Sequence, residues 1–173
     1  MNAAFFGRTN KHLASTSERH FKVWVDLPAD TWHGHAREGL WCSKTGPNTF
    51  KIRNNPFYAF GLSYNDEVEA TSSADPYGYV FSSIARKGGH STYRCMVFSP
   101  AEKENLTTHI EALNAHGSYY ESAEYETMTL FAFDVPPEAD VAAIYRILEQ
   151  GLADGTWDFE EADYCRPGET GGR

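Results

Sequence analysis

The chain has 173 residues, of which 41% are hydrophobic and 14% aromatic, and its formal net charge is −9 at pH 7. This length suits one domain or two small ones, and the aromatic content argues against a disordered chain. No apolar run approaches the roughly 18 residues of a membrane span, and the start lacks a signal-peptide core. Cys42, Cys95 and Cys165 are too widely spaced to suggest a disulfide framework or a paired-cysteine zinc site. The composition predicts a cytoplasmic protein with reduced thiols, no membrane association and no cofactor.

Acidic and basic residues are unevenly distributed along the chain. Residues 1–60 contain eight basic and four acidic side chains, whereas residues 118–164 contain twelve acidic side chains and one basic one, Arg146. Phosphate contacts need clustered lysine and arginine, so direct nucleic-acid binding is not expected. An acidic half favours a basic protein partner and fast, salt-sensitive association, or it serves only solubility.

The first half of the chain is predicted to be rich in strands. Residues 1–17 are expected to form a mobile arm, and Phe21–Val25 alternates in the manner of a strand. Four further short runs follow with turn residues between them, and this pattern predicts a small β-barrel or half-barrel over residues 18–90. The four runs are Gly39–Ser43, Thr49–Ile52, Glu67–Thr71 and Tyr77–Ala85.

The second half mixes strands and helices. After a strand at Thr92–Phe98, Ser99–Glu102 has the pattern of a capping box with proline at the first helical position. That pattern predicts a helix beginning there, which Gly117 ends. A strand pair, a second helix opened by Pro136 and Pro137, and a last strand then follow. The strands are Tyr119–Tyr125, Met128–Val135 and Trp157–Tyr164.

The predicted fold class is therefore α+β. A barrel-like part precedes a ferredoxin-like split βαβ part, with the order βαββαβ, over residues 91–165, and residues 166–173 form a mobile tail. Each predicted helix has one apolar stripe, so both helices need the same face of the sheet. The alternative is one continuous α+β domain in which the strand at Thr92–Phe98 belongs to the preceding sheet.

The Gly88–Arg94 segment has the highest density of candidate functional residues. Its glycines let the backbone approach a ligand, His90 can act as a general base near neutral pH, and Arg94 can hold a carboxylate or phosphate. On a strand, Thr92 and Arg94 share a face, so His90, Thr92 and Arg94 are expected to line one surface. In an enzyme, His90 would be the base and Arg94 the anion clamp. The alternative is a structural turn, with Arg94 paired to a nearby acid such as Asp66.

Aromatic residues are concentrated in residues 55–64, which contain four of them. Such a cluster forms either the core of a small β domain or the wall of an apolar pocket. The residues expected to line that pocket are Trp41, Phe57, Tyr64, Asp66 and Thr92.

His33 and His35 place two imidazoles two residues apart. A zinc site would need a third ligand, which no nearby motif supplies. No metal site is therefore predicted, and an exposed loop is expected instead.

Short sequence patterns between residues 40 and 94 also carry a family resemblance. They are Leu40-Trp41, Asn55-Pro56-Phe57, Gly61, Ser63-Tyr64, Asp66, Val68, Gly89-His90-Ser91-Thr92 and Arg94. In these patterns the chain resembles a bacterial family described as domain of unknown function 4265, with a common layout from about Phe21 to Tyr164.

Three positions depart from that family. Asn55 stands where the family usually has an aliphatic residue, Asn65 where it usually has glycine, and Gly88 where serine is common. The family description carries no activity, so the resemblance implies a two-part layout and no reaction.

Two functions of different classes fit these features. The first is a protein-binding module, specifically an immunity-type inhibitor that neutralises a toxin or another basic partner through its acidic half. The alternative is a small-molecule-binding enzyme or sensor that uses the Gly88–Arg94 segment. A third hypothesis is a regulator that mimics nucleic acid through its acidic face. The carboxylates expected to face a basic partner are Glu121, Glu124, Asp158, Glu160 and Glu161.

Overall fold

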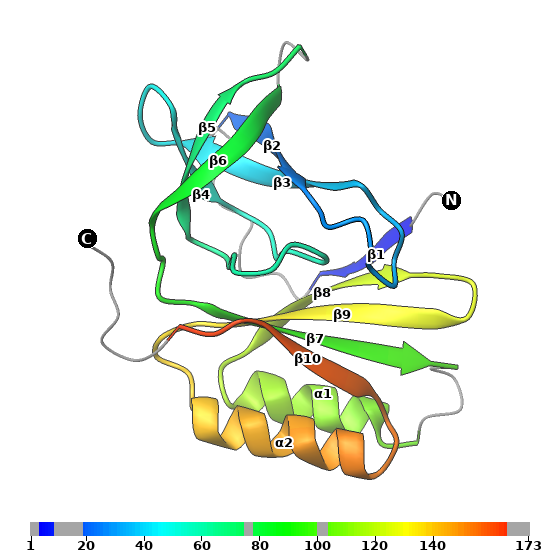
Figure 1. Ribbon diagram of the computed structural model, residues 1–173. Helices are drawn as coiled ribbons and strands as arrows, with labels where there is room; N and C mark the ends of the chain where they lie inside the picture. Colours follow the sequence, from blue (N-terminus) through cyan, green and yellow to red (C-terminus); the bar gives the residue numbers. More distant parts are fainter. Residues whose placement is uncertain (1–3, 9–18, 75–77, 100–103, 166–173) are drawn as a thin grey trace.

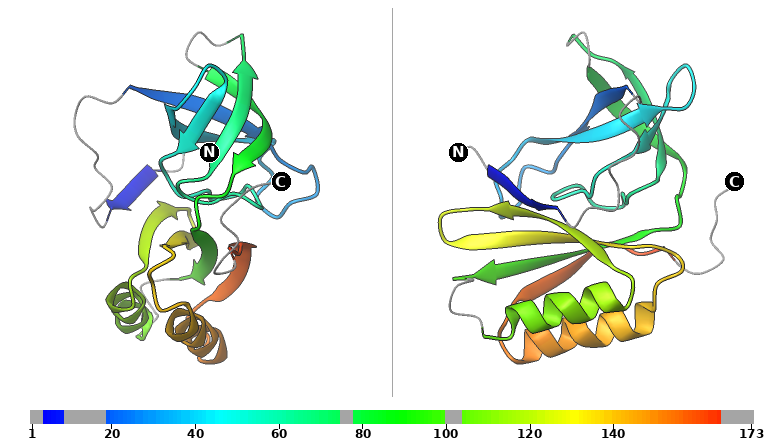
Figure 2. Two further views of the ribbon diagram at one scale, coloured as in Figure 1. Left: turned by 90° about the vertical axis from the view of Figure 1, so that its left-hand side faces the viewer. Right: turned by 180° about the vertical axis from the view of Figure 1, so that it is seen from behind.

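The computed structural model describes residues 4–8, 19–74, 78–99 and 104–165. It contains a strand barrel and a separate sheet that two helices cover on one face (Figure 1). The barrel lies against the other face of that sheet, as the two further views confirm (Figure 2). The sheet is thus the middle layer of the molecule.

The barrel is closed by five strands: β2 (His20–Asp26), β3 (Arg37–Lys44), β4 (Thr49–Ile52), β5 (Glu67–Ser72) and β6 (Gly78–Arg86). Successive strands pair antiparallel, and β2 pairs parallel with β6 to close the ring. Alternate side chains point inward and form an apolar core that includes Val23, Leu40, Phe50, Ile52 and Val68.

The sheet has the strand order β1-β8-β9-β7-β10, with every neighbouring pair antiparallel. Its strands are β1 (Ala4–Arg8), β7 (Ser91–Phe98), β8 (Tyr119–Glu124), β9 (Met128–Val135) and β10 (Asp158–Asp163). The helices are α1 (Leu106–Ala115) and α2 (Val141–Ala153).

The two faces of the sheet form two separate cores. On the helix-facing side, Tyr93, Cys95 and Val97 of β7 pack with residues of both helices. On the barrel-facing side, Phe57 from the loop after β4 packs with Leu130 and other small apolar residues of β8 and β9. The second core joins the barrel to the sheet, and the candidate site lies along this contact.

The predicted mixture of a strand barrel with a second sheet and two helices is confirmed. The structure differs at the ends. The expected mobile arm over residues 1–17 contains a strand, β1, which pairs with β8, and the expected tail lies outside the described residues. Within the described ranges, neither helix has the length and apolar character of a membrane span.

The predicted start of the second helix is wrong, and the predicted first residues of the first helix, 100–102, lie outside the described residues. Helix α1 begins at Leu106 with Asn105 at the N-cap position, while Ser99 has a φ of 49° and belongs to the turn after β7. Helix α2 begins after Asp140, whose side chain accepts a hydrogen bond from the Ala143 N–H at 3.0 Å. A side-chain acceptor there satisfies an otherwise unpaired helix donor, so the N-cap residue and not the preceding prolines sets this start.

Candidate functional site

The Gly88–Arg94 segment carries the chain from the barrel to the sheet. His90, Thr92 and Arg94 lie on the barrel-facing side of β7, as predicted, because their contacts are with barrel loops, while Tyr93 points into the helix-facing core. All three side chains are buried. They form part of a polar network, here called the junction, between barrel and sheet.

The His90 imidazole is held at both ring nitrogens. Its Nδ1 lies 2.7 Å from an Asp134 carboxylate oxygen, and its Nε2 lies 3.1 Å from the Asn65 amide nitrogen. Asn65 in turn accepts a hydrogen bond from Arg53 at 2.9 Å, so its amide N–H₂ faces the imidazole. The neutral tautomer with hydrogen on Nδ1 satisfies both contacts. Neither ring nitrogen is left to accept a proton from a substrate in this arrangement.

Asp66 is the centre of a second part of the junction. Its carboxylate is fully buried and accepts hydrogen bonds from the Ser63 and Gly88 backbone N–H groups at 2.9 and 2.7 Å. The Lys87 ammonium donates to the same carboxylate at 2.6 Å. A buried ion pair of this kind is stable only when its remaining hydrogen-bonding groups are satisfied, and here the two backbone donors contribute to that.

The same network reaches the edge of the sheet. Lys87 also donates to Asp163 of β10, and the Ser63 hydroxyl donates to Asp163 at 2.7 Å. Thr92 of β7 donates to Ser63 at 2.9 Å. Burial lowers the pKa of Lys87, but its hydrogen bonds to Asp163 and Asp66 outweigh this and raise the pKa above its ordinary value. Lys87 therefore stays charged and links the barrel to β10.

Arg94 forms the third part of the junction. Its Nη1 donates to the Phe57 carbonyl at 2.8 Å, its Nε lies 3.1 Å from a Glu160 carboxylate oxygen, and its guanidinium lies 4.3 Å from the centre of the Phe60 ring. The predicted pairing of Arg94 with Asp66 is wrong, because Lys87 reaches Asp66 while β10 brings Glu160 to Arg94. Burial lowers the pKa of Arg94, against the opposing effect of Glu160.

Glu38 fixes the loop that Arg94 contacts. Its buried carboxylate accepts the backbone N–H groups of Phe57, Tyr58 and Ala59 at 2.6, 3.0 and 2.7 Å. Burial raises the pKa of Glu38, although the hydrogen bonds from Ala59 and Phe57 and the charge of Arg94 oppose the shift. Glu38 was not predicted from the sequence, because a charged residue at an inward position of a barrel strand gives no local signal of its loop partners.

Asn65 and Gly88, two of the positions that depart from the family pattern, lie next to each other in the structure. Asn65 adopts a φ of 66°, the left-handed conformation that favours the glycine expected there from the resemblance. A Cβ atom at Gly88 would lie only 2.4 Å from the Asn65 backbone. Gly88 is therefore required by the close approach of the two chain segments.

The expected pocket is not assembled as one cavity wall. Phe57, Tyr64, Asp66 and Thr92 are all buried at or beside the junction, with the Tyr64 ring 5.3 Å from that of His90. Trp41 instead lies on the outside of the barrel, 46% exposed, with the Lys22 ammonium 4.6 Å from its ring centre. An outward strand position separates it from the others.

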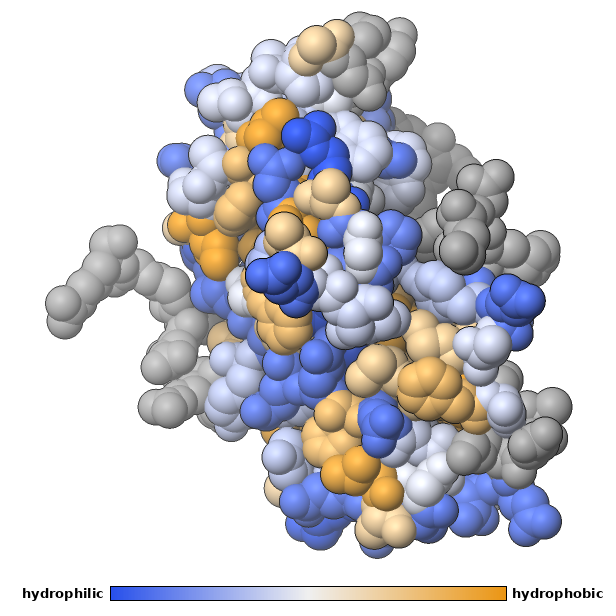
Figure 3. Space-filling model, turned by 45° about the vertical axis from the view of Figure 1, so that its right-hand side comes forward, coloured by the Kyte–Doolittle hydropathy of each residue, from blue (hydrophilic) through white to orange (hydrophobic). Residues whose placement is uncertain are grey.

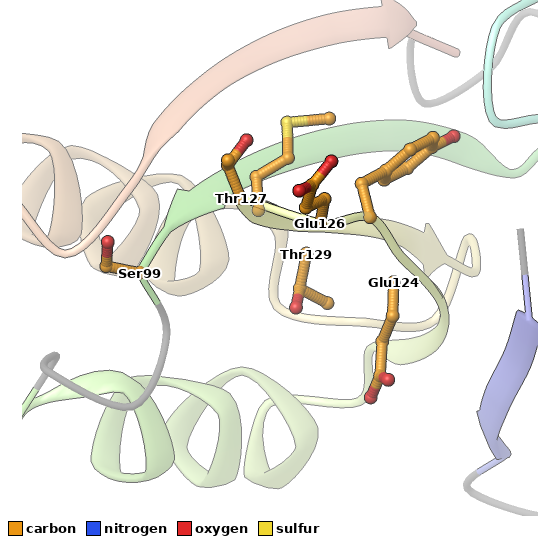
Figure 4. Close-up of a pocket in the computed structure, with 7 residues that line it drawn as sticks. Ser99, Glu124, Glu126, Thr127 and Thr129 are labelled. Atoms are coloured by element: carbon orange, nitrogen blue, oxygen red, sulfur yellow. The ribbon is translucent and has the colours of Figure 1, made fainter. Parts of the chain in front are cut away.

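A depression of about 440 Å³ lies elsewhere, at the turn between β8 and β9 (Figure 4). Its lining is polar apart from an aromatic ring and a thioether, and the sequence did not predict it. The lining residues are Ser99, Glu124, Tyr125, Glu126, Thr127, Met128 and Thr129. The depression is remote from His90 and Lys87, which lie at the opposite end of the sheet.

His33 and His35 pack on Tyr58 near the surface. The two imidazoles stack with centres 5.5 Å apart, and both lie within 5 Å of the Tyr58 ring. Among the residues that the structure describes, no group of three or more potential ligands is placed to hold a metal. Trp32, half exposed, extends this aromatic cluster at 6.4 Å from Tyr58.

The five predicted binding carboxylates occupy two separate strands. Glu121 and Glu124 lie on β8, while Asp158, Glu160 and Glu161 lie on β10, and two other strands separate the pair. Glu121 is half-buried and accepts the Asn55 N–H at 3.3 Å, and Glu160 faces Arg94. Glu124, Asp158 and Glu161 are exposed. The structure therefore does not bring the five into one continuous surface.

Exposed acidic residues are nevertheless concentrated in the sheet–helix half. The described residues 104–165 have ten exposed carboxylates, one exposed arginine (Arg146) and no lysine. Six of the carboxylates lie on the helices or the turns beside them, two at the β8–β9 turn and two on β10. They are Glu104, Glu111, Glu138, Asp140, Glu149, Asp154, Glu124, Glu126, Asp158 and Glu161.

Comparisons with known proteins address the fold and the family. A family model described as "Domain of unknown function (DUF4265)" matches residues 38–159. A crystal structure of a hypothetical protein from Neisseria gonorrhoeae is similar, with a TM-score of 0.68 and 17% identity over 86% of this chain and 97% of that one. No curated protein matches. At this identity the structural likeness shows a common fold alone.

Proposed function

The chain belongs to the DUF4265 family, and from its surface we propose that it is a protein-binding module for a basic partner protein. The proposed class is an immunity-type inhibitor, which covers the basic active surface of a toxin or similar protein. The observation that carries the proposal is the excess of exposed carboxylates in the sheet–helix half.

The contrast with the barrel supports a local role for this charge. The described barrel residues 19–86 expose four basic side chains and three acidic ones, so the surface there is mixed. Among the described residues of the sheet–helix half, 104–165, ten carboxylates are exposed against Arg146. A surface with one sign of charge accelerates association with an oppositely charged protein and disfavours other partners.

The burial of the candidate catalytic residues in the junction also supports the proposal of a protein-binding module. His90 and Arg94, the candidates for catalysis, are buried and engaged with Asp134, Asn65, Glu160 and the Phe57 carbonyl. Both imidazole nitrogens and Nη1 of Arg94 have hydrogen-bond partners within the molecule, although the buried Nη2 of Arg94 has none among the described residues. The exposed carboxylates, in contrast, are directly accessible to a partner.

The proposal also covers the type of fold in the sheet–helix half, the division into two parts and the location of the protein in the cell. The antiparallel order β8-β9-β7-β10 with two helices on one face supports a ferredoxin-like split βαβ unit that β1 extends. The division near residue 90 makes the barrel and this unit the two structural parts. Free thiols at Cys42, Cys95 and Cys165 fit a reducing compartment and support a cytoplasmic location.

The test begins with capture of the partner from the native host by the full-length chain. Association of the purified pair is then measured by stopped flow from low to moderate salt. The variant Glu124→Lys/Asp158→Lys/Glu161→Lys reverses three exposed carboxylates of the acidic half. We expect its association rate at low salt to fall by about tenfold or more, with a flatter salt dependence.

A matched control reverses three exposed carboxylates of the barrel, Asp26→Lys/Asp30→Lys/Glu69→Lys, and changes the net charge equally. The proposal expects a much smaller effect from it. A captured partner without a basic surface, or equal effects of the two triple variants, would refute the proposal. If the partner is toxic when expressed alone, rescue of growth by this chain supports the immunity role, and failure of rescue argues against it.

A further inference from the structure

Strand β10 forms an edge of the sheet. Among the described strands it pairs with β7 alone, and it lies at the end of the strand order (Figure 1). An edge strand presents backbone N–H and C=O groups that another strand can pair with. A barrel loop contacts its far end, where Gly61 donates to the Ala162 carbonyl at 2.9 Å. The part of the edge without this contact runs over residues 158–161.

The two sides of this edge differ in chemistry. Asp158 and Glu160 pair with Met96 and Arg94 of β7 and therefore point to the barrel-facing side. Phe159 pairs with Cys95 and points to the helix-facing side, where its ring lies 5.9 Å from that of Tyr145. Glu161 pairs with Tyr93 and shares the helix-facing side with Phe159. The barrel-facing side of the edge is thus acidic, and the helix-facing side combines aromatic rings with one carboxylate.

Exposed aromatic rings lie on both sides of this edge. Tyr145 is 37% exposed on the helix-facing side, and Phe60 is 56% exposed on the barrel-facing side next to Arg94. The face of the molecule seen in Figure 3 has apolar residues in patches bordered by hydrophilic ones, on the barrel as well as over the sheet and helices. The edge therefore offers both charge and apolar contact area to an added strand.

We propose that β10 accepts a β-strand of the basic partner. The added strand carries lysine or arginine on the barrel-facing side, opposite Asp158 and Glu160, and apolar side chains on the helix-facing side, beside Phe159 and Tyr145. Backbone pairing supplies affinity and the alternating side chains supply selectivity. This inference rests on the proposed function and specifies how the basic partner binds.

Charge selects this occupant over a second copy of the chain. Four of the six residues of β10 are acidic, namely Asp158, Glu160, Glu161 and Asp163. Pairing of two β10 strands would place like charges opposite each other, which destabilises a sheet, whereas a basic strand makes favourable cross-strand pairs. The other edge, β1 (Ala4–Arg8), has no acidic residue in its sequence and gives no such selection.

The experiment uses a defined probe with the full-length chain. The probe is a capped eight-residue peptide of alternating lysine and valine, which places the two kinds of side chain on opposite sides of a strand. Binding is measured by calorimetry, and amide exchange of the chain is followed by NMR. We expect binding to slow amide exchange over Asp158–Glu161 and to leave Ala4–Arg8 unchanged.

Two control peptides separate strand pairing from charge attraction. One carries a methyl group on every backbone nitrogen, so it keeps the charge and cannot donate to β10. The other has the same composition in two blocks, four lysines and then four valines. We expect each to bind at least about tenfold more weakly than the alternating peptide, because each lacks either the backbone donors or the two-sided pattern.

A variant tests the role of the acidic, barrel-facing side of the edge. Asp158→Lys reverses the exposed carboxylate on that side, leaves Glu160 in contact with Arg94 and should weaken binding of the alternating peptide by at least about tenfold. Equal binding of the alternating and methylated peptides overturns strand addition while leaving the acidic half as a partner surface. If the native basic partner is captured but the alternating peptide does not bind, strand addition is also overturned. If neither the peptide nor a basic partner binds, the proposed function fails as well.

Discussion

The junction and the outer surface of the sheet–helix half both depend on charged residues, but they use them differently. At the junction, Asp66, Lys87 and Arg94 are buried or nearly so, and each has an opposite charge within 3.1 Å. On the outer surface, ten carboxylates and one arginine are exposed within residues 104–165. The first arrangement closes the charges off from any partner, and the second leaves them accessible.

This difference predicts that the two regions respond differently to substitution. Removing one member of a buried pair leaves a charge without compensation, which costs far more free energy than the loss of an exposed pair. Junction variants should therefore change stability, and surface variants should change binding. The predictions below test this separation, beginning with the largest expected effect.

Asp66→Ala should be the most damaging change. It removes the acceptor of the Ser63 and Gly88 N–H groups and one of the two carboxylates that hold Lys87. We expect the free energy of unfolding, measured by urea denaturation, to fall by about 3–5 kcal/mol. The control Glu67→Ala removes an exposed pair with Arg86 and should cost at most about 1 kcal/mol. Similar losses of unfolding free energy in the two variants would contradict the distinction between buried and exposed charge pairs.

Glu38→Gln should have the next largest effect. An amide has one oxygen where the carboxylate has two, so at least one of the Phe57, Tyr58 and Ala59 N–H groups loses its acceptor. The expected loss of unfolding free energy at neutral pH is about 1–3 kcal/mol.

The pH dependence of the same variant has a defined sign. Burial raises the pKa of Glu38 in the folded protein above 4.5, so the folded state binds this proton more tightly than the unfolded state. The contribution of Glu38 is therefore most favourable below pH 4.5 and declines as the pH rises through the raised pKa. Denaturation at several pH values should show this decline in the parent chain and its absence in Glu38→Gln.

His90→Ala tests whether the junction is structural or catalytic. The change removes hydrogen bonds to Asp134 and Asn65, and we expect a loss of unfolding free energy of about 1–3 kcal/mol. Association with the basic partner should be unchanged at a temperature where the variant is folded. A variant of unaltered stability that no longer binds its ligand or partner would place function at the junction and contradict the separation.

Asp154→Asn should have the smallest effect. Hydrogen bonds from Thr156, His109 and Asn105 hold the pKa of the exposed Asp154 carboxyl well below its ordinary value. A depressed pKa gives a stabilising contribution that is complete above the ordinary value of 3.8 and is lost as the pH falls below it. Thermal unfolding should show a small loss for the variant at pH 7 that disappears in acid. A loss that persists in acid would show that the charge of Asp154 is not its cause.

The sequence predicted those features that local patterns determine. Alternation located β2, turn residues on either side located β4, and strand parity placed Thr92 with Arg94. The predicted cap of the first helix at Ser99 is wrong, because Ser99 has a φ of 49° and α1 begins at Leu106.

Long-range partners were not predictable from such patterns. Arg94 meets Glu160 because β10 pairs with β7, and Lys87 meets Asp163 for the same reason, although each pair is more than sixty residues apart. Glu38 of β3 reaches the Phe57 N–H because the loop after β4 folds back toward β3. Periodicity reports which side a residue faces, but it does not identify the residue opposite.

The chain crosses from the barrel to the sheet through Gly88 and Gly89, yet side chains fasten the two parts at separate points. Lys87 holds Asp163, Arg94 holds the Phe57 carbonyl, and the Asn55 amide donates to the Ala132 carbonyl at 2.9 Å. Separating the parts would break all of these bonds and expose the apolar contact around Phe57. The two parts should therefore melt cooperatively, as a single calorimetric transition whose van't Hoff and measured enthalpies agree.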